Sequence, residues 1–294
     1  MADRIDALFV FDAGDAFVQF TATDANGYYR FDNLTAGEYV VVLPGDNFRN
    51  VGGGDTVAAD PLAGYWSTGT SVNASGVLSE TATNDPDNNV DATSNSATSE
   101  ENGITTFTST ALSSANPLNY VSSSAITIGP TTDEPTGETD LVSGANPQGN
   151  LDNRANMTVD FGFYRVGIGN LIFVDNQIAG VSDGQYVPAS SDQTLGSATV
   201  ELLTADGLTV LNTFTTLANG LYSFTGYPAG DYIVRVTPPA GYASTVDTAN
   251  SNDTTEPDYN ADNNDNGPGI ANGSVTSGIL TMTPGGGTAT GGGN

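Results

Sequence analysis

The chain has 294 residues, which at about 150 residues per domain predicts two domains. Its formal net charge is −28 at pH 7, because it has 34 acidic residues and six basic residues. The chain contains no lysine, histidine or cysteine. These absences exclude a thiol nucleophile, a Ser-His-Asp triad, an ordinary zinc site and a disulfide. The charge also disfavours nucleic acid as a partner and favours divalent cations with oxygen ligands, although it could serve solubility alone.

No apolar run approaches the roughly 20 residues of a membrane-spanning helix, so no membrane insertion is expected. The first residues lack the charged start and apolar stretch of a signal peptide. We therefore expect a mature form, a fragment or an internal part of a longer protein.

In chain order, the first strong signal is a pattern that occurs twice at a constant offset of 193 residues. Residues 24–31 (DANGYYRF) correspond to 217–224 (LANGLYSF), and 37–43 (GEYVVVL) correspond to 230–236 (GDYIVRV). The Asn-Gly pairs predict tight hairpin turns, and the alternating residues that follow predict strands facing a core. A stacking role for the tyrosines on a cofactor or carbohydrate is the less favoured alternative. The pattern predicts a tandem repeat.

Further strands surround this pattern in both copies. In the first copy they are 5–11, 17–23 and 121–128, and in the second 198–204, 210–216 and 275–282. Each copy thus shows at least four short strands and no helical periodicity. The predicted fold is all-β, with two tandem Ig-like or prealbumin-like β-sandwich domains.

The first copy carries an insertion of 16 residues between Pro44 and Ala63, because the offset of the next match falls from 193 to 177. Trp66, the only tryptophan, lies beside this insertion. It is predicted to cover the edge of the domain or to contact a partner. The region Pro44–Trp66 is therefore the candidate surface for binding a host protein or a glycan.

Two acidic, Asn-rich loops offer side-chain oxygens at about every second residue, a spacing by which a turning loop can direct several oxygens at one hard cation. The candidate ligands are Asp85, Asp87, Asn89 and Asp91 in the first copy, and Asp258, Asn260, Asp262, Asn264 and Asp265 in the second. Asp175 and Asp183 are expected to contribute further ligands. The EF-hand consensus is not met, and solvated turns are the alternative. Calcium is the predicted ion.

Paired carboxylates also occur in glycosidases, where one acid must sit in an apolar pocket beside the other. In this chain the carboxylates cluster in polar loops instead. We therefore predict a protein that is not an enzyme.

The two copies differ at their ends. Residues 157–164 form a predicted strand with no counterpart after Pro284, and residues 167–175 form one with no counterpart before Ile5. We thus predict a domain at 1–165 that lacks its first strand and a domain at 166–294 that lacks its last. Because such edges expose unpaired N–H and C=O groups, the predicted partners are copies of the chain or neighbouring repeats, joined head to tail by strand pairing.

Residues 158–164, 169–175 and 219–242 resemble the B domain of serine-aspartate-repeat adhesins, which is related to the collagen-adhesin B-type domain. The resemblance covers nearly the whole chain. It implies β-sandwich modules in tandem on a bacterial cell surface, often with bound calcium, and hence an extracellular stalk, adhesin or filament. Three features depart from the family: the calcium-loop motif is only partly kept at 175–183, no lysine is available for an isopeptide bond, and no Leu-Pro-x-Thr-Gly motif occurs.

Overall fold

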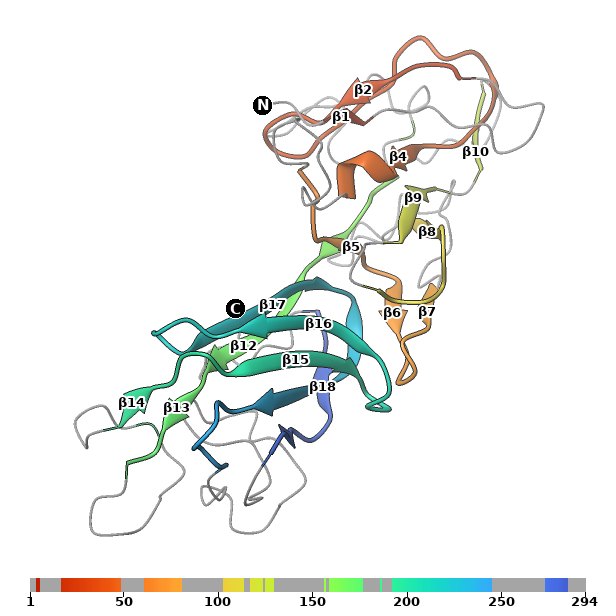
Figure 1. Cartoon of the computed structure of the whole chain (residues 1–294). Helices are drawn as coiled ribbons and strands as arrows, with labels where there is room; N and C mark the ends of the chain where they lie inside the picture. Colours follow the sequence, from red (N-terminus) through yellow and green to blue (C-terminus); the bar gives the residue numbers. More distant parts are fainter. Residues whose placement is uncertain are drawn as a thin grey trace. The chain divides into compact units, whose positions relative to one another are not determined.

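The structure, a computed structural model, is shown in Figure 1. It describes residues 4–5, 17–48, 61–80, 103–113, 117–123, 125–129, 156, 159–176, 186, 192–244 and 273–284. Regular structure in these ranges consists of strands and one 3-10 helix, η1 (Gly45–Phe48), so the all-β prediction is confirmed. Within these ranges, no helix is long and apolar enough to cross a membrane.

The chain separates into two compact units. Unit 1 comprises Met1–Thr70, Glu80–Thr110 and Asn116–Tyr164. Unit 2 comprises Ser71–Ser79, Ala111–Ala115 and Arg165–Asn294. A short segment of the first sequence copy, Ser71–Ser79, thus belongs to the unit that holds the second copy.

Unit 2 is built on a seven-stranded sheet centred on β18 (Ala229–Thr237). One side of β18 pairs antiparallel with β15 (Thr199–Thr204), which pairs in turn with the edge strand β16 (Val210–Thr215). The alternation predicted for β18 is present, since Tyr232 and Val234 are buried. These side chains lie in the core because successive side chains of a strand point to opposite faces.

Three more strands of this sheet pair with β18, and a fourth pairs with one of them. They are β19 (Val275–Thr276) and β20 (Leu280–Met282), both antiparallel, and β6 (Thr70–Val72), which is parallel and continues to β7 (Leu78–Glu80). Two further pairs complete unit 2. They are β12 (Val166–Leu171) with β17 (Leu221–Tyr227), and β13 (Phe173–Val174) with β14 (Gln193–Thr194).

Unit 1 contains a three-stranded sheet in the order β4 (Val42–Pro44), β9 (Leu118–Ser122) and β8 (Ile104–Phe107). Three two-stranded pairs accompany it: β1 (Arg4–Ile5) with β2 (Thr21–Ala22), β3 (Gly37–Tyr39) with β10 (Ile126–Ile128), and β5 (Trp66–Ser67) with β11 (Phe163–Tyr164). Its largest buried side chains are Trp66 and Phe48.

One strand pairing has the same register in both units. In unit 1, Gly37 of β3 lies opposite Ile128 of β10; in unit 2, Gly230 of β18 lies opposite Met282 of β20. These positions correspond at the sequence offsets of 193 and 154. The same residue pattern therefore forms the same strand pairing at both places.

A reciprocal serine contact repeats in the same way. The Ser123 N–H donates to the Val41 carbonyl (2.9 Å), and the Val41 N–H donates to Ser123 Oγ (3.0 Å). Ser277 and Val234 exchange the equivalent bonds, at 2.8 Å and 3.0 Å. Each serine thus closes a gap between two short strands that would otherwise leave backbone groups unpaired.

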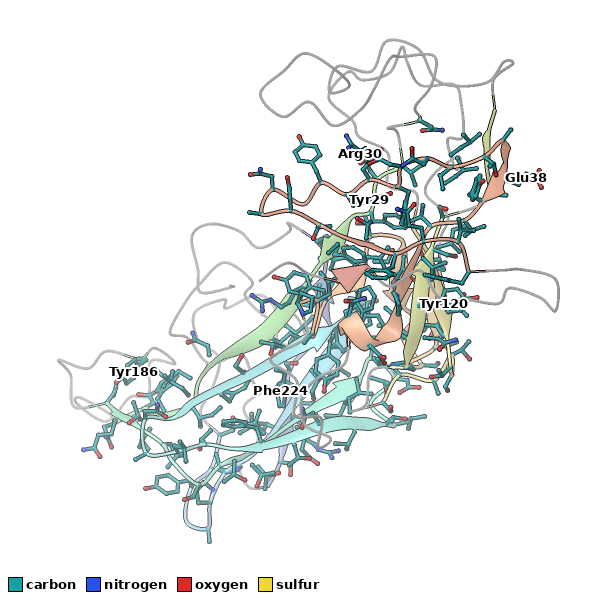
Figure 2. All side chains as sticks on the ribbon, turned by 90° about the horizontal axis from the view of Figure 1, so that it is seen from above. Tyr29, Arg30, Glu38, Tyr120, Tyr186 and Phe224 are labelled. Atoms are coloured by element: carbon teal, nitrogen blue, oxygen red, sulfur yellow. The ribbon has the colours of Figure 1, made fainter. Side chains whose placement is uncertain are left out.

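One predicted strand is wrong in the described structure. Residues 28–31 of the first copy lie outside any strand, whereas their counterparts lie in β17. The difference follows from pairing, because β17 is held by β12 over Val166–Leu171. Tyr29 is fixed instead by a hydrogen bond from its hydroxyl to the Val159 carbonyl (2.5 Å) and by ring contact with Phe161 (Figure 2).

The tyrosines give the fold a pH dependence on the alkaline side. Burial raises the pKa of Tyr222 to about 12, while an unfolded tyrosine titrates near 10. Between these values the unfolded chain loses protons that the folded chain keeps, so the free energy of unfolding falls as pH rises. Because lysine and cysteine are absent, tyrosine is the dominant titrating side chain in this range. The urea concentration at the unfolding midpoint should therefore fall as the pH rises above about 10. The fall should be less steep for Tyr222→Phe than for the unmodified protein, and an equal fall in both would contradict this prediction.

Candidate functional site

One predicted calcium ligand, Asp175, lies at the end of a strand pair. Phe173 of β13 lies opposite Thr194 of β14, and Val174 opposite Gln193. Asp175 directly follows β13, and Asp192 directly precedes β14. Asp192 is buried, and its Oδ1 accepts a hydrogen bond from the Asn176 N–H (2.9 Å). Two carboxylates therefore stand at the base of the segment 176–191. Asp192 was missed by the sequence analysis, because only the pairing of β13 with β14 brings it to the end of the strand that precedes Asp175.

Tyr186, which lies between Asp175 and Asp192 in the sequence, contacts β13. The ring of Tyr186, which Figure 2 labels, packs on Phe173. The two ring centroids lie 5.4 Å apart. The contact holds Tyr186 against β13. Residues 177–185 and 187–191 lie outside the described residues.

The other predicted ligands lie outside the described residues. They are Asp85, Asp87, Asn89, Asp91, Asp183, Asp258, Asn260, Asp262, Asn264 and Asp265. Among the described residues, no group of three or more His, Cys, Asp or Glu side chains could hold a metal ion. The calcium sites therefore stay predictions.

Trp66 does not form a binding surface. Its side chain is only 1% exposed, and β5 pairs with β11 so that Trp66 lies opposite Tyr164. Neighbouring residues are also packed within unit 1. The Leu62 N–H donates a hydrogen bond to the Asn47 carbonyl (3.0 Å), and the ring centroids of Phe48 and Phe163 lie 5.3 Å apart. A buried side chain cannot meet a partner, so the interpretation of Trp66 as a contact residue is corrected to a core residue.

The sequence analysis did not predict a hairpin that pairs with β18. The hairpin Ser71–Ser79, formed by β6 and β7, adds a parallel strand to β18, with Ser71 opposite Ala229 and Val72 opposite Gly230. Its turn is closed by Asn73, whose Oδ1 accepts hydrogen bonds from the N–H groups of Ser75 and Val77 at 3.0 Å each. Short polar stretches of this kind give little periodic signal, so only the fold shows where the hairpin lies.

Comparison with known proteins finds one matching family. A family model described as the SdrD B-like domain matches residues 166–276. Similar proteins are serine-aspartate repeat-containing protein I of Staphylococcus saprophyticus (35% identical over 134 residues) and protein F of Staphylococcus epidermidis (32% over 109 residues). Protein D of Staphylococcus aureus is 33% identical over 106 residues. No solved structure gives a significant match.

The matches cover 44%, 36% and 35% of this chain for proteins I, F and D. The chain spans only 7%, 6% and 8% of these relatives, so their other regions say nothing about it. The similarity agrees with the resemblance drawn from the sequence, and the non-enzymatic role at the extracellular cell surface belongs to the proposal below. The matched region supports the Ig-like, B-type fold, whereas the number of complete copies stays a prediction. Residues 166–276 of this chain are therefore similar to the SdrD B-like domain family.

Proposed function

We propose that the chain is a structural module of a cell-surface stalk or filament, stabilised by calcium. The observation that carries the proposal is the repeated strand register, in which Gly37 and Gly230 have equivalent partners in two separate units. The connection between units supports it too, since β11 ends at Tyr164 and β12 begins at Val166. Modules that follow one another directly along the chain are the arrangement from which a spacer is built.

The partners that we propose are other copies of the chain or neighbouring repeats, paired head to tail through strands. The support comes from β12, which pairs with β17 along Val166–Leu171 immediately after the unit boundary. Residues 28–34 correspond in sequence to β17. A strand resembling β12 from a neighbour would extend this part of unit 1, in the manner of β-strand addition.

Sedimentation velocity at rising protein concentration tests this assembly. We expect larger species to form, and a peptide of residues 165–175 added in excess should prevent them, because it offers the β12 sequence in trans. A scrambled peptide of the same composition is the control. A single species at every concentration would contradict head-to-tail pairing.

Calcium is proposed to bind near Asp175 and Asp192 in unit 2, with ligands added from the acidic loops. Two observations support the proposal. The pairing of β13 with β14 brings Asp175 and Asp192 to the same end of the strand pair, and Asp192 is buried. An ion bound only by the folded state stabilises it by about 2.7 kcal/mol at 100 times its Kd. EDTA should therefore lower the melting temperature, and added calcium should restore it.

The variant Asp192→Asn should weaken this calcium dependence. Asp231→Asn is the matched control, because Asp231 lies in the same unit and accepts a hydrogen bond from Thr281 Oγ1 (2.6 Å), far along the chain from the loop. The control is expected to shift the melting temperature without changing its response to calcium. If the melting curve is the same in EDTA and in millimolar calcium, calcium does not stabilise the fold, and the proposal is contradicted.

A further inference from the structure

We propose that Asn26 is a site of spontaneous chemical modification, at which the side-chain amide is lost and aspartate or isoaspartate remains, and that the fold protects the equivalent Asn219. Both residues precede a glycine in the Asn-Gly turns that occupy the same place in the two copies. Both asparagines are exposed. The modification goes beyond the structural role proposed above and does not depend on it.

The reaction needs only the atoms of the turn and water. The main-chain nitrogen of Gly27 attacks Cγ of Asn26, and a bond between them forms as the bond from Cγ to Nδ2 breaks. Nδ2 leaves as ammonia and takes the proton of the Gly27 N–H with it, so that a cyclic succinimide remains. Water then opens this ring at either of its carbonyl carbons, which gives aspartate or isoaspartate. A glycine after the asparagine favours the attack, because it has no Cβ to hinder the nitrogen and its backbone is the least restricted.

The first turn is held by contacts within itself. The Gly27 N–H donates to the Asp24 carbonyl (3.1 Å), and the Asp24 N–H donates to the Tyr28 carbonyl (2.8 Å). Oδ1 of Asp24 also accepts hydrogen bonds from the N–H groups of Asn26 (2.8 Å) and Tyr28 (3.1 Å). Within the described residues the side-chain amide of Asn26 makes no hydrogen bond, and a Cβ on Gly27 would meet nothing within 4 Å. Among the contacts described, the turn therefore loses only its own hydrogen bonds when it opens.

The second turn is fixed by neighbouring segments. The Gly220 carbonyl accepts a hydrogen bond from the Ile172 N–H (2.9 Å), and Thr194 Oγ1 donates one to the Ala218 carbonyl (2.8 Å). Gly220 is buried, and a Cβ there would lie 2.3 Å from the Ile172 carbonyl oxygen. The strands on either side of this turn, β16 and β17, are both paired with other strands. Movement of the main chain at Gly220 therefore breaks contacts with two other segments.

The reacting amide of Asn219 is itself held in place. Its Oδ1 accepts a hydrogen bond from the Leu221 N–H (3.2 Å), while the Gly220 N–H donates to the Leu217 carbonyl (2.8 Å). Both bonds must break before the Gly220 nitrogen can reach Cγ of Asn219. The rate of such a reaction in a folded protein follows the population of the locally open state, which is smaller where more contacts must break. Asn26 therefore reacts faster than Asn219.

The products change the first turn. Loss of the amide adds one negative charge at residue 26. Isoaspartate also places an additional carbon atom in the main chain between Asp24 and Tyr28, whose main-chain hydrogen bond closes the turn. The surface charge and the turn geometry of the first copy thus change as the protein ages.

Peptide mass spectrometry of the folded full chain, sampled over time, tests the proposal. The protein is incubated at about pH 9, where tyrosine is still protonated, and is then cleaved after arginine. Peptides 5–30 and 166–235 each contain one Asn-Gly pair, and the pairs at 102–103, 266–267 and 272–273 fall in other peptides. The mass gain from replacing the amide by a carboxyl group should appear at Asn26 at least about ten times faster than at Asn219, with isoaspartate among the products.

Two results of this measurement would overturn the proposal. The first is an equal rate at the two asparagines, or a faster reaction at Asn219, because the second turn would then give no protection. The second is a product at residue 26 that contains aspartate without isoaspartate, because opening of the succinimide ring yields both.

Protein unfolded in urea is the control for local sequence. Residues 25–27 and 218–220 both read Ala-Asn-Gly. The two rates should approach each other in urea, because the contacts that distinguish the turns are lost. A difference of the same size in urea would show that it comes from the sequence, and the protection by the fold would be contradicted.

Thr194→Val tests the protecting contact directly. The variant removes the hydroxyl that donates to the Ala218 carbonyl, so Asn219 should react faster while Asn26 keeps its rate. Thr215→Val is the matched control, because Thr215 is an exposed threonine at the end of β16, beside the same turn. This control should leave both rates unchanged. If Asn219 reacted no faster in Thr194→Val than in Thr215→Val, the protection assigned to this contact would be wrong.

Discussion

Replacing Gly220 by alanine is expected to lower the free energy of unfolding by about 3 kcal/mol or more, since it combines backbone strain with overpacking. Gly220 has φ 69°, where residues with a side chain are strained. A Cβ would also lie 2.3 Å from the Ile172 carbonyl oxygen and 3.1 Å from the Leu195 nitrogen. These backbone atoms cannot move aside, because the Ile172 N–H donates to the Gly220 carbonyl and the Leu195 N–H to the Ile172 carbonyl.

Gly27→Ala is the matched control, because Gly27 is the counterpart of Gly220 in the first Asn-Gly turn. It has φ 91°, and a Cβ there would meet nothing within 4 Å. Only the backbone strain remains, so the expected loss is about 1 to 2 kcal/mol. Urea denaturation of both variants gives the comparison. Equal losses would mean that β12 and β13 do not lie against the second turn as described.

Replacing Tyr232 by alanine is expected to cost about 3 to 5 kcal/mol, the range for large aromatic side chains in a core. Tyr232 is 1% exposed, and its hydroxyl donates a hydrogen bond to the Pro228 carbonyl (2.7 Å). Its ring also contacts Tyr227 edge-on, with centroids 6.1 Å apart. Tyr232→Phe removes only the hydroxyl and should cost about 1 to 3 kcal/mol, because the buried carbonyl loses its partner.

Tyr39 provides a comparison within the same chain. Its hydroxyl donates to the Thr35 carbonyl (2.6 Å), the equivalent of the bond made by Tyr232, but the site is more exposed. Water can replace the lost bond there, so Tyr39→Phe should cost less than Tyr232→Phe. Chemical denaturation measures both. A larger loss for Tyr39→Phe would show that the first copy, and not the second, depends more on this contact.

Much of the local structure could be predicted from the sequence. A few adjacent residues are enough to predict the Asn-Gly turns and the strand with buried Tyr232 and Val234. The offsets of 193 and 154 also match the strand pairs at Gly37 and Gly230. These features depend on short-range patterns, which is why a single sequence reveals them.

Features that depend on distant partners could not be predicted. Residues 28–31 have the alternation of a strand, but alternation does not say whether a partner strand is present, and only β17 is paired with β12. The sequence left Trp66 as a residue that covers the edge of the domain or contacts a partner, and its pairing with Tyr164 places it in the core. The position of Asp192 and the hairpin Ser71–Ser79 likewise follow from register between segments far apart in the chain.

Electron microscopy of the full chain in millimolar calcium tests the central claim, that the chain is a repeating structural module of a stalk or filament. We expect linear particles with a repeat of two domains, because head-to-tail strand pairing joins different ends and does not close on itself. Particles that remain single two-domain molecules at every concentration, with or without calcium, would contradict the account.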